Sequence, residues 1–284
     1  MVVMPTGSGK SHVIADFVLH MNEQKKQKTL IVSHVKEILL QNYEKLQDAW
    51  PYGDIGLYGA SLKSRDTDND IIYAQLQSVW SKVDLLPLFD LLVIDEAHLV
   101  PKEGEGMYRS LILALKEQKP DLKVVGFTAT PYRLNSGMLI EGKEPIFDDI
   151  AIDFGSGENF VRLIDDGYLS PLVTKCMDTE YDIESVGIRG GDVLTTGFDA
   201  PNTDMIVMLR PTQSPGLYVQ MMGRGMRIAE GKKNCLVLDF AKNIERHGPI
   251  NQIKPNQKGQ RKKTGESLVK SCPSCQSYVP KASM

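Results

Sequence analysis

Hydrophobic residues follow two different periods along the first 150 residues of the chain. Short runs in which nearly every residue is apolar are typical of buried strands. Such runs occur at residues 29–32, 71–73, 91–94 and 124–127. Between them apolar residues recur every three or four positions, a period that predicts amphipathic helices. These helices are expected at residues 13–21, 35–46 and 108–118. Buried strands that alternate with helices predict an α/β fold with a parallel sheet covered on both faces.

The pattern is weaker after residue 150. Residues 151–171 hold three glycines and a proline around one short helical stretch, which is typical of a connector. Beyond the connector, strands are expected at residues 172–177, 205–209 and 235–238, and a helix at residues 216–226. No amphipathic helix is evident between residues 178 and 215, although parallel strands need a crossover of about a dozen residues or more, usually helical. A second α/β domain therefore lacks elements.

These patterns divide the chain into four parts. They are a complete first domain at 1–150, the connector at 151–171, a partial second domain at 172–246 and a basic tail at 247–284. From residue 242 onward nine Lys and Arg stand against two Glu, whereas the whole chain of 284 residues has a net charge of −3. A basic tail favours contact with phosphate backbones, and a solvated charge run is an equally good alternative.

The cysteine content and the hydropathy indicate a cellular setting. Four cysteines are sparse, so a reducing compartment is expected, by default the cytoplasm. No apolar run reaches the roughly 18 residues of a membrane span, so no membrane contact is expected. Cys272 and Cys275 resemble the first half of a zinc ribbon, but zinc takes four ligands, so we expect no zinc there. Cys176 and Cys235 are expected to be small core residues.

The segment Met-Pro-Thr-Gly-Ser-Gly-Lys-Ser that begins at Met4 is typical of a phosphate-binding loop. Gly7 and Gly9 allow backbone N–H groups to turn toward phosphates, and the following helix adds its positive N-terminal end. Lys10 would reach the β- and γ-phosphates of ATP, and the Ser11 hydroxyl would bind magnesium. Met4 stands where the strict pattern has glycine, and for this motif alone a glycine-rich turn without a ligand is the alternative.

Asp95 and Glu96 follow the apolar run at residues 91–94. They are therefore expected where a parallel strand ends, at the edge where such sheets bind ligands. Asp95 would hold magnesium directly or through water, and Glu96 would polarise the attacking water. Two exposed acids after a strand are the alternative, which the phosphate loop upstream disfavours. We expect the strand at residues 124–127 to lie beside the one that ends at Asp95.

Gln220, Arg224 and Arg227 are expected on one helix. Residues three apart on a helix share a face, so the two arginines would point to the same side. Two guanidinium groups on one face can stabilise the charge on a transferred γ-phosphoryl group, as an arginine finger does. Taken alone, the two residues would be read as surface arginines.

With these motifs in this order, the chain resembles superfamily 2 helicases, specifically the DEAD/DEAH-box group close to bacterial RadD-type DNA repair helicases. The matching segments are residues 5–11, 31–41, 74–78, 95–98, 126–133, 194–202 and 220–227. The resemblance implies two RecA-like domains of the P-loop NTPase class, with ATP in the cleft and a nucleic-acid strand across both domains.

The resemblance also implies a role for each matching residue. ATP-binding roles fall on Thr6, Gly7, Ser8, Gly9, Lys10, Ser11, Gly197 and Asp199. Catalytic roles fall on Lys10, Asp95, Glu96, Arg224 and Arg227, with Ser11 and Asp95 as the magnesium ligands. Nucleic-acid contacts fall on Ser33, His34, Gln77, Ser78, Thr195 and Thr196. Thr128 and Thr130 would couple the two sites.

The chain departs from the family in the second domain. Gly190-Gly191-Asp192 runs directly into residues 193–197, where the family has a long stretch with a helix–strand–helix core. About half of a second RecA-like domain is therefore expected to be missing, judged against a typical domain of about 150 residues.

We therefore expect an ATP-dependent DNA helicase or translocase in a shortened form. Its turnover of ATP should be impaired, because the helix with Arg224 and Arg227 is poorly supported without the crossover elements. For the same reason Arg224→Ala should cause little further loss of turnover. One alternative is a non-enzymatic remnant that binds ATP and nucleic acid. Another is the motor subunit of a restriction system, although we find no nuclease motif.

Overall fold

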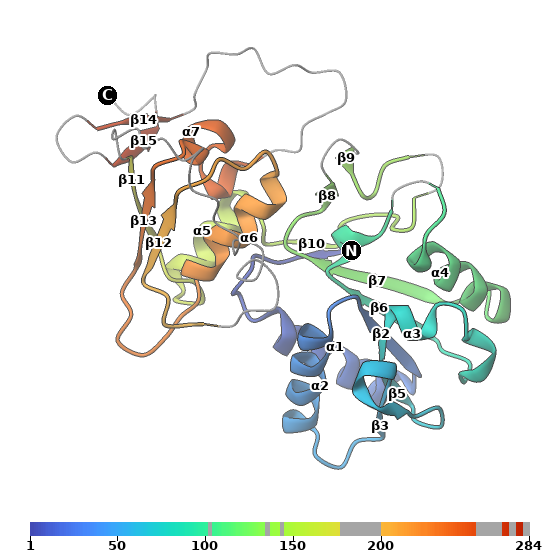
Figure 1. The fold of residues 1–284 in the computed structure, drawn as a ribbon. Helices are drawn as coiled ribbons and strands as arrows, with labels where there is room; N and C mark the ends of the chain where they lie inside the picture. The colour runs from blue at the N-terminus through green and yellow to red at the C-terminus, as the bar shows by residue number, and fades with distance from the viewer. Residues whose placement is uncertain are drawn as a thin grey trace. The chain divides into compact units, whose positions relative to one another are not determined.

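The computed structural model describes residues 1–101, 104–133, 137–142, 145–176, 200–253, 269–272 and 277–280. It falls into two compact units (Figure 1). The first unit comprises Met1–Val3, Gly9–Pro131 and Met138–Ile152, and the second comprises Met4–Ser8, Tyr132–Gly137 and Asp153–Met284. Thr195, Thr196, Gly197, Asp199 and Cys275 lie outside the described residues.

An eight-stranded sheet with the order β10-β1-β7-β6-β2-β5-β3-β4 forms the centre of the first unit. Its strands are β1 (Val2–Val3), β2 (Thr29–Ser33), β3 (Ile55–Gly59), β4 (Ser64–Arg65), β5 (Ile71–Gln75), β6 (Leu91–Asp95), β7 (Lys123–Thr128) and β10 (Ile152–Asp153). The pairs from β1 to β3 are parallel, whereas β4 folds back antiparallel to β3. The predicted parallel sheet is therefore correct at the centre and wrong at this edge.

Helices cover both faces of this sheet, as the alternation of strands and helices predicted. They are α1 (Lys10–Lys25), α2 (Lys36–Ala49), α3 (Leu76–Val79) and α4 (Met107–Gln118). One hydrophobic cluster joins α1 and α2 to strand residues such as Ile31 and Val93. A second joins α4 to the alternate residues Leu30 and Leu92. Successive strand side chains point to opposite faces, so each apolar run contributes to both clusters. Figure 1 shows the helices on the two sides of the sheet.

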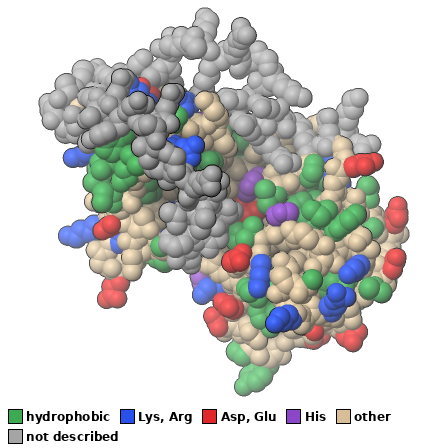
Figure 2. Space-filling model, in the orientation of Figure 1, with side chains coloured by type: hydrophobic (Ala, Val, Ile, Leu, Met, Phe, Trp, Pro, Cys, Tyr) green, Lys and Arg blue, Asp and Glu red, His purple; other side chains and the backbone are tan. Residues whose placement is uncertain are grey.

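The second unit contains a smaller parallel sheet with the order β11-β13-β12. Its elements are α5 (Gly157–Asp165), β11 (Leu172–Cys176), β12 (Met205–Met208), α6 (Pro215–Gly225), β13 (Cys235–Asp239) and α7 (Asn243–His247). Met208 and Val237 face a core that includes Tyr218 of α6. On the other face Met205 and Val207 are 51% and 47% exposed, and Figure 2 shows hydrophobic side chains gathered there. Within the described residues, this sheet is covered on one face.

Helix α6 is well supported, which contradicts the expectation from the missing crossover elements. At its start the Ser214 side chain accepts a hydrogen bond from Leu217 N at 3.2 Å, with Pro215 in the first turn. Its buried face carries Tyr218, which is fully buried in the core. At its end Lys232 Nζ donates to the carbonyl of Gly225 at 2.8 Å. A cation at the helix C-terminus satisfies free carbonyls and complements the helix dipole.

Among the residues that the structure describes, the shorter elements are two strand pairs and four 3₁₀ helices. They are β8 (Tyr132–Arg133) with β9 (Gly137–Met138), β14 (Val269–Ser271) with β15 (Tyr278–Pro280), and helices at Ala60–Leu62, Val83–Leu85, Ala97–Leu99 and Ile250–Gln252. Among the described residues, no helix is long and apolar enough to cross a membrane. In the same residues, no group of three or more His, Cys, Asp or Glu could hold a metal ion.

Candidate nucleotide site

The loop before α1 has the backbone form that the glycines predicted. Gly7 and Gly9 take φ values of 90° and 82°, in the left-handed region that favours glycine. Between them Ser8 donates to the carbonyl of Pro5 through its amide at 3.3 Å and its hydroxyl at 2.8 Å. Helix α1 begins at Lys10 without a side-chain cap and without an acidic residue in its first turn. Its N–H groups and positive end therefore suit an anion.

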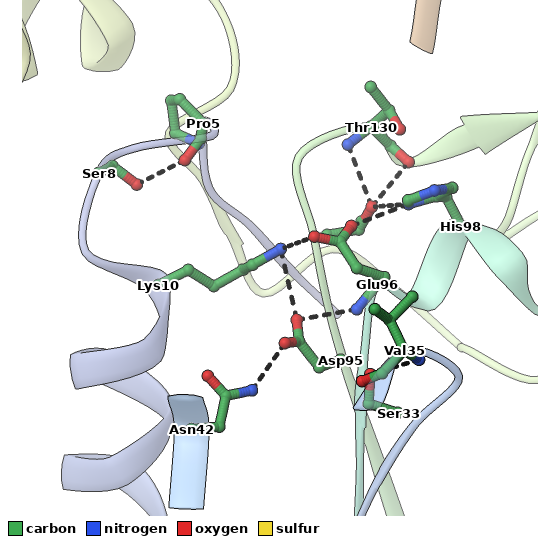
Figure 3. Close-up of polar contacts among 11 residues, drawn as sticks. Pro5, Ser8, Lys10, Ser33, Val35, Asn42, Asp95, Glu96, His98 and Thr130 are labelled. Carbon is green, nitrogen blue, oxygen red and sulfur yellow. Dashed lines mark hydrogen bonds and ion pairs between the residues drawn. The ribbon is translucent and has the colours of Figure 1, made fainter. Parts of the chain in front are cut away.

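Lys10 lies between the two carboxylates that follow β6 (Figure 3). Its Nζ is 2.5 Å from Glu96 Oε1 and 3.3 Å from Asp95 Oδ1. Burial would lower the pKa of Lys10, but the negative charges of Asp95 and Glu96 outweigh burial and raise it. Burial would raise the pKa of Glu96, but the Lys10 charge and the contact with His98 hold it well below its usual range. Both groups are therefore charged at neutral pH.

The backbone at Glu96 has an unusual conformation. Its φ is 53°, in a region that residues other than glycine occupy rarely. The turn follows directly after β6, whose last residue is Asp95, and it leads into the 3₁₀ helix Ala97–Leu99. Such conformations cost free energy and are concentrated at functional sites. Here the turn lets two consecutive side chains contact the same ammonium group.

His98 connects Glu96 to the next strand, a link that the sequence did not indicate. Its Nδ1 lies 3.1 Å from Glu96 Oε2 and 3.1 Å from Thr128 Oγ1. The Thr128 hydroxyl donates to the carbonyl of Thr130 at 3.0 Å and accepts from its amide at 3.1 Å. These contacts place the His98 ring between the Glu96 carboxylate and the Thr128 hydroxyl. As predicted, β7 lies beside β6, with Phe127 opposite Asp95.

Asn42 is a second site residue that the sequence analysis missed. It lies on α2 and is fully buried. Its Nδ2 donates to Asp95 Oδ2 at 2.7 Å (Figure 3). The signal that could have found it is a polar residue on the apolar face of an amphipathic helix, since Leu39 and Leu46 share that face.

The predicted strand-contact residues of the first unit lie close together. β2 ends at Ser33 and its parallel neighbour β5 ends at Gln75, so their carboxyl ends are adjacent. Gln77 Nε2 is 3.0 Å from His34 Nδ1 and donates to the His34 carbonyl at 3.0 Å. Ser78 Oγ accepts from the amide of Ala60 at 3.0 Å. Ser33 instead bonds locally, to Val35.

The two arginines belong to the second unit, and they do not share one helix. Arg224 lies in the last turn of α6, but the helix ends at Gly225 with Met226 as its cap, so Arg227 follows the helix. The prediction that one helix carries both arginines is therefore wrong. Lys232 Nζ donates to the Arg227 carbonyl at 2.7 Å, which holds the segment after the helix. Burial lowers the pKa of both guanidinium groups.

The donor set of the loop before α1 and of the end of β6 fits a magnesium nucleotide. The left-handed glycines and the uncapped start of α1 suit phosphate oxygens. Asp95 supplies the hard carboxylate oxygens that magnesium prefers, and Glu96 places a second carboxylate beside it. The Lys10 ammonium group, which here contacts the carboxylates of Asp95 and Glu96, can bind phosphate oxygens in the same way. The residues present are thus compatible with ATP and magnesium.

Comparison with known proteins gives matches that cover much of the chain. Residues 1–133 match the family described as "Type III restriction enzyme, res subunit". The chain is 24% identical over 337 aligned positions to a Saccharomyces cerevisiae protein named as an ATP-dependent helicase, IRC3. This alignment covers 84% of the chain and 48% of IRC3, so the chain spans about half the length of that relative.

The alignment with IRC3 is longer than the part of this chain that it covers. Since 84% of 284 residues is about 239, roughly 100 of the 337 aligned positions have no counterpart in this chain.

Two solved structures show the fold. The DNA-bound ATP-dependent Type ISP restriction-modification enzyme LlaBIII has a TM-score of 0.57 at 15% identity, covering 84% of this chain and 26% of that one. Dbp5 of S. cerevisiae, bound to RNA and ADP BeF3, has a TM-score of 0.51 at 14% identity, covering 85% of this chain and 78% of that one. The shared fold is the RecA-like α/β fold.

Proposed function

Because this chain belongs to superfamily 2 of the helicases, we propose that it is an ATP-dependent motor, a helicase or translocase that moves on DNA. The observation that carries the proposal is the cluster of Lys10, Asp95 and Glu96 beside the phosphate-binding loop. Kinship with RadD-type DNA repair helicases is a finer part of the same proposal.

In this proposal each group of the phosphate-binding loop and of the end of β6 has one task. Lys10 exchanges its carboxylate partners for the β- and γ-phosphates, and Thr6–Ser11 surround those phosphates. Ser11 and Asp95 hold magnesium, which when bound offsets the charge that develops during phosphoryl transfer. Glu96, ionised because its pKa is depressed, accepts a proton from the attacking water. His98 holds the second oxygen of Glu96 in place.

The strand is proposed to lie along the neighbouring carboxyl ends of β2 and β5. His34 and Gln77 there present polar groups in a fixed mutual geometry. Ser33, Ser78, Thr195 and Thr196 are the further proposed contacts. Thr128 and Thr130 are proposed to couple this region to the nucleotide, and the support is the contact of Thr128 with His98 beside Glu96.

The second unit is proposed to add groups for the same nucleotide. Arg224 and Arg227 would stabilise negative charge on the transferred γ-phosphoryl group. Their supports are the buried position of α6 and the Lys232 contacts at its end. Gly197 and Asp199 are the further proposed ATP contacts.

The decisive experiment measures ATP hydrolysis by the purified full chain with no nucleic acid, with single-stranded DNA and with single-stranded RNA. We expect hydrolysis that DNA stimulates.

Glu96→Gln should keep nucleotide affinity but lower kcat by about 10² to 10⁴, the usual contribution of a general base. Lys10→Ala should abolish nucleotide binding, with a melting curve to show that the chain still folds. Equal nucleotide affinity for wild type and Lys10→Ala would refute the assignment.

Two other functions each have one observation in their favour. The positions missing from the alignment with IRC3 favour a remnant that binds ATP and nucleic acid without turnover. The same assay identifies it, because wild type would bind ATP yet hydrolyse none. The family description over residues 1–133 favours the motor of a restriction system. Hydrolysis stimulated by duplex DNA but not by single strands would support that function.

A further inference from the structure

Asn42 is a buried polar side chain that the tasks above do not use. It lies on α2 among apolar neighbours, and its exposed fraction is 0%. A buried amide costs free energy unless it is hydrogen bonded, so its presence among leucines needs a reason. Its Nδ2 donates to Asp95 Oδ2 at 2.7 Å, across 53 residues of sequence.

The contact completes the set of donors around the Asp95 carboxylate. Oδ1 accepts from the Glu96 amide at 2.8 Å and lies 3.3 Å from Lys10 Nζ, while Oδ2 accepts from Asn42 (Figure 3). Two neutral donors, one on each oxygen, fix the rotation of the carboxylate about its Cβ–Cγ bond. Of the three partners Lys10 is the one proposed to move to phosphate, so Asn42 and the amide remain.

Asn42 itself is held firmly. It lies in the middle of α2 (Lys36–Ala49), and Leu39 and Leu46 on either side of it belong to the core that joins α1, α2 and the sheet. A side chain on a packed helix holds a partner with greater precision than one on a loop. Outer partners of ligating carboxylates orient them and tune metal affinity.

We propose that Asn42 is a positioning residue that sets the orientation of the Asp95 carboxylate for magnesium. This inference rests on the proposed function, because it assumes that Asp95 binds the magnesium of ATP. The role is distinct from packing, since Leu or Met would fill the same space among apolar neighbours without the cost of a buried amide.

The test compares Asn42→Leu, Asn42→Ser and Leu46→Ala with wild type in the full chain. A fluorescent, non-hydrolysable ATP analogue is titrated at increasing Mg²⁺ concentrations and in EDTA. Asn42→Leu should need about tenfold more Mg²⁺ for half-maximal binding, at the low end of the effect of losing an outer partner. Its affinity in EDTA should be unchanged. Asn42→Ser, which keeps a hydroxyl donor, should fall between.

Leu46→Ala is the matched control, because Leu46 is equally buried on α2 and belongs to the α1–α2 core rather than to the carboxylate site. It should lower the melting temperature and leave the Mg²⁺ dependence as in wild type. An unchanged Mg²⁺ dependence in Asn42→Leu would overturn the inference and leave the proposed function standing. If Asn42→Leu lost the same nucleotide affinity with Mg²⁺ as in EDTA, the inference would be overturned in the same way. Wild type that binds no nucleotide would overturn both. If Asn42→Leu does not fold, Asn42→Ala against Asn42→Ser gives the same comparison.

Discussion

At the scale of single residues, the site is a compact group of charges that depend on one another. Lys10 is the cation in contact with two carboxylates, and their side chains are 13%, 1% and 18% exposed for Lys10, Asp95 and Glu96. A buried charge is costly without a partner, so the contact with Lys10 keeps Glu96 ionised and the two carboxylates keep Lys10 charged. When a nucleotide draws Lys10 away, the carboxylates lose the positive charge beside them. The magnesium ion that accompanies the nucleotide would replace that positive charge.

The depressed pKa of Glu96 predicts how stability depends on pH. Its usual pKa is 4.5, and contact with Lys10 lowers it in the folded protein despite burial. The stabilisation is therefore fully present above pH 4.5 and is lost as the pH falls through the lower folded pKa. We expect the urea midpoint of the first unit to fall between about pH 5 and pH 3 more steeply in wild type than in Glu96→Gln.

The measurement is tryptophan fluorescence, because both tryptophans, Trp50 and Trp80, lie in the first unit. Glu117→Gln, a change of an exposed carboxylate on α4, is the control and should follow wild type. If wild type and Glu96→Gln lost stability in parallel on acidification, the charge contact with Lys10 would not stabilise the folded protein.

Much of this residue-level picture was predictable, because it follows from where strands end. Asp95 was predicted at the end of a buried strand next to the one before Thr128, and β6 and β7 are adjacent. Asn42 and His98 were not predicted, because each is recognised by a partner far along the chain. Nothing local tells that the amide of one helix reaches the carboxylate of a strand 53 residues away.

At the scale of elements, prediction succeeded where burial is continuous. Strands β2, β5, β6 and β7 are apolar on both faces and were found, whereas β3 contains two glycines, which weaken the strand signal, and was missed. The support of α6 was misjudged for another reason. Its N-terminal cap and the Lys232 contact at its end come from residues outside the helix itself.

The two faces of the second sheet predict that a Val→Thr substitution lowers the free energy of unfolding on one face and hardly changes it on the other. Val237 on β13 is fully buried against α6, whereas Val207 on β12 is 47% exposed on the other face. Val237→Thr should lower the free energy of unfolding by about 1–3 kcal/mol, the cost of burying a hydroxyl without a partner. Val207→Thr should change it by less than about 0.5 kcal/mol, as surface changes do.

Far-UV circular dichroism during urea denaturation follows both units, and fluorescence follows the first unit alone because it contains both tryptophans. Val237→Thr should shift the circular dichroism transition while the fluorescence transition stays as in wild type. Equal effects of the two substitutions would mean that both faces of this sheet are covered in solution.

At the scale of the whole molecule, the chain combines a first unit with a full sheet and a second unit with a three-stranded one. The α/β fold followed from the alternation of strands and helices along the chain. The proposed shortening of the second domain rests on the resemblance to superfamily 2 helicases, because an internal deletion would leave no pattern of its own in one sequence.

The last prediction concerns Arg224 and the turnover of the whole chain. We expected little loss from Arg224→Ala because α6 would be poorly supported, and the packed, capped helix removes that reason. A guanidinium on a firmly held helix can act as an arginine finger, which is worth about 10³ to 10⁵ in rate. We now expect Arg224→Ala to lower DNA-stimulated kcat by about 10³ with little change in KM for ATP.

Arg210→Ala, at an exposed arginine of the same unit, is the control and should turn over ATP like wild type. Unchanged kcat in Arg224→Ala, in a chain that otherwise hydrolyses ATP, would show that turnover proceeds without this arginine.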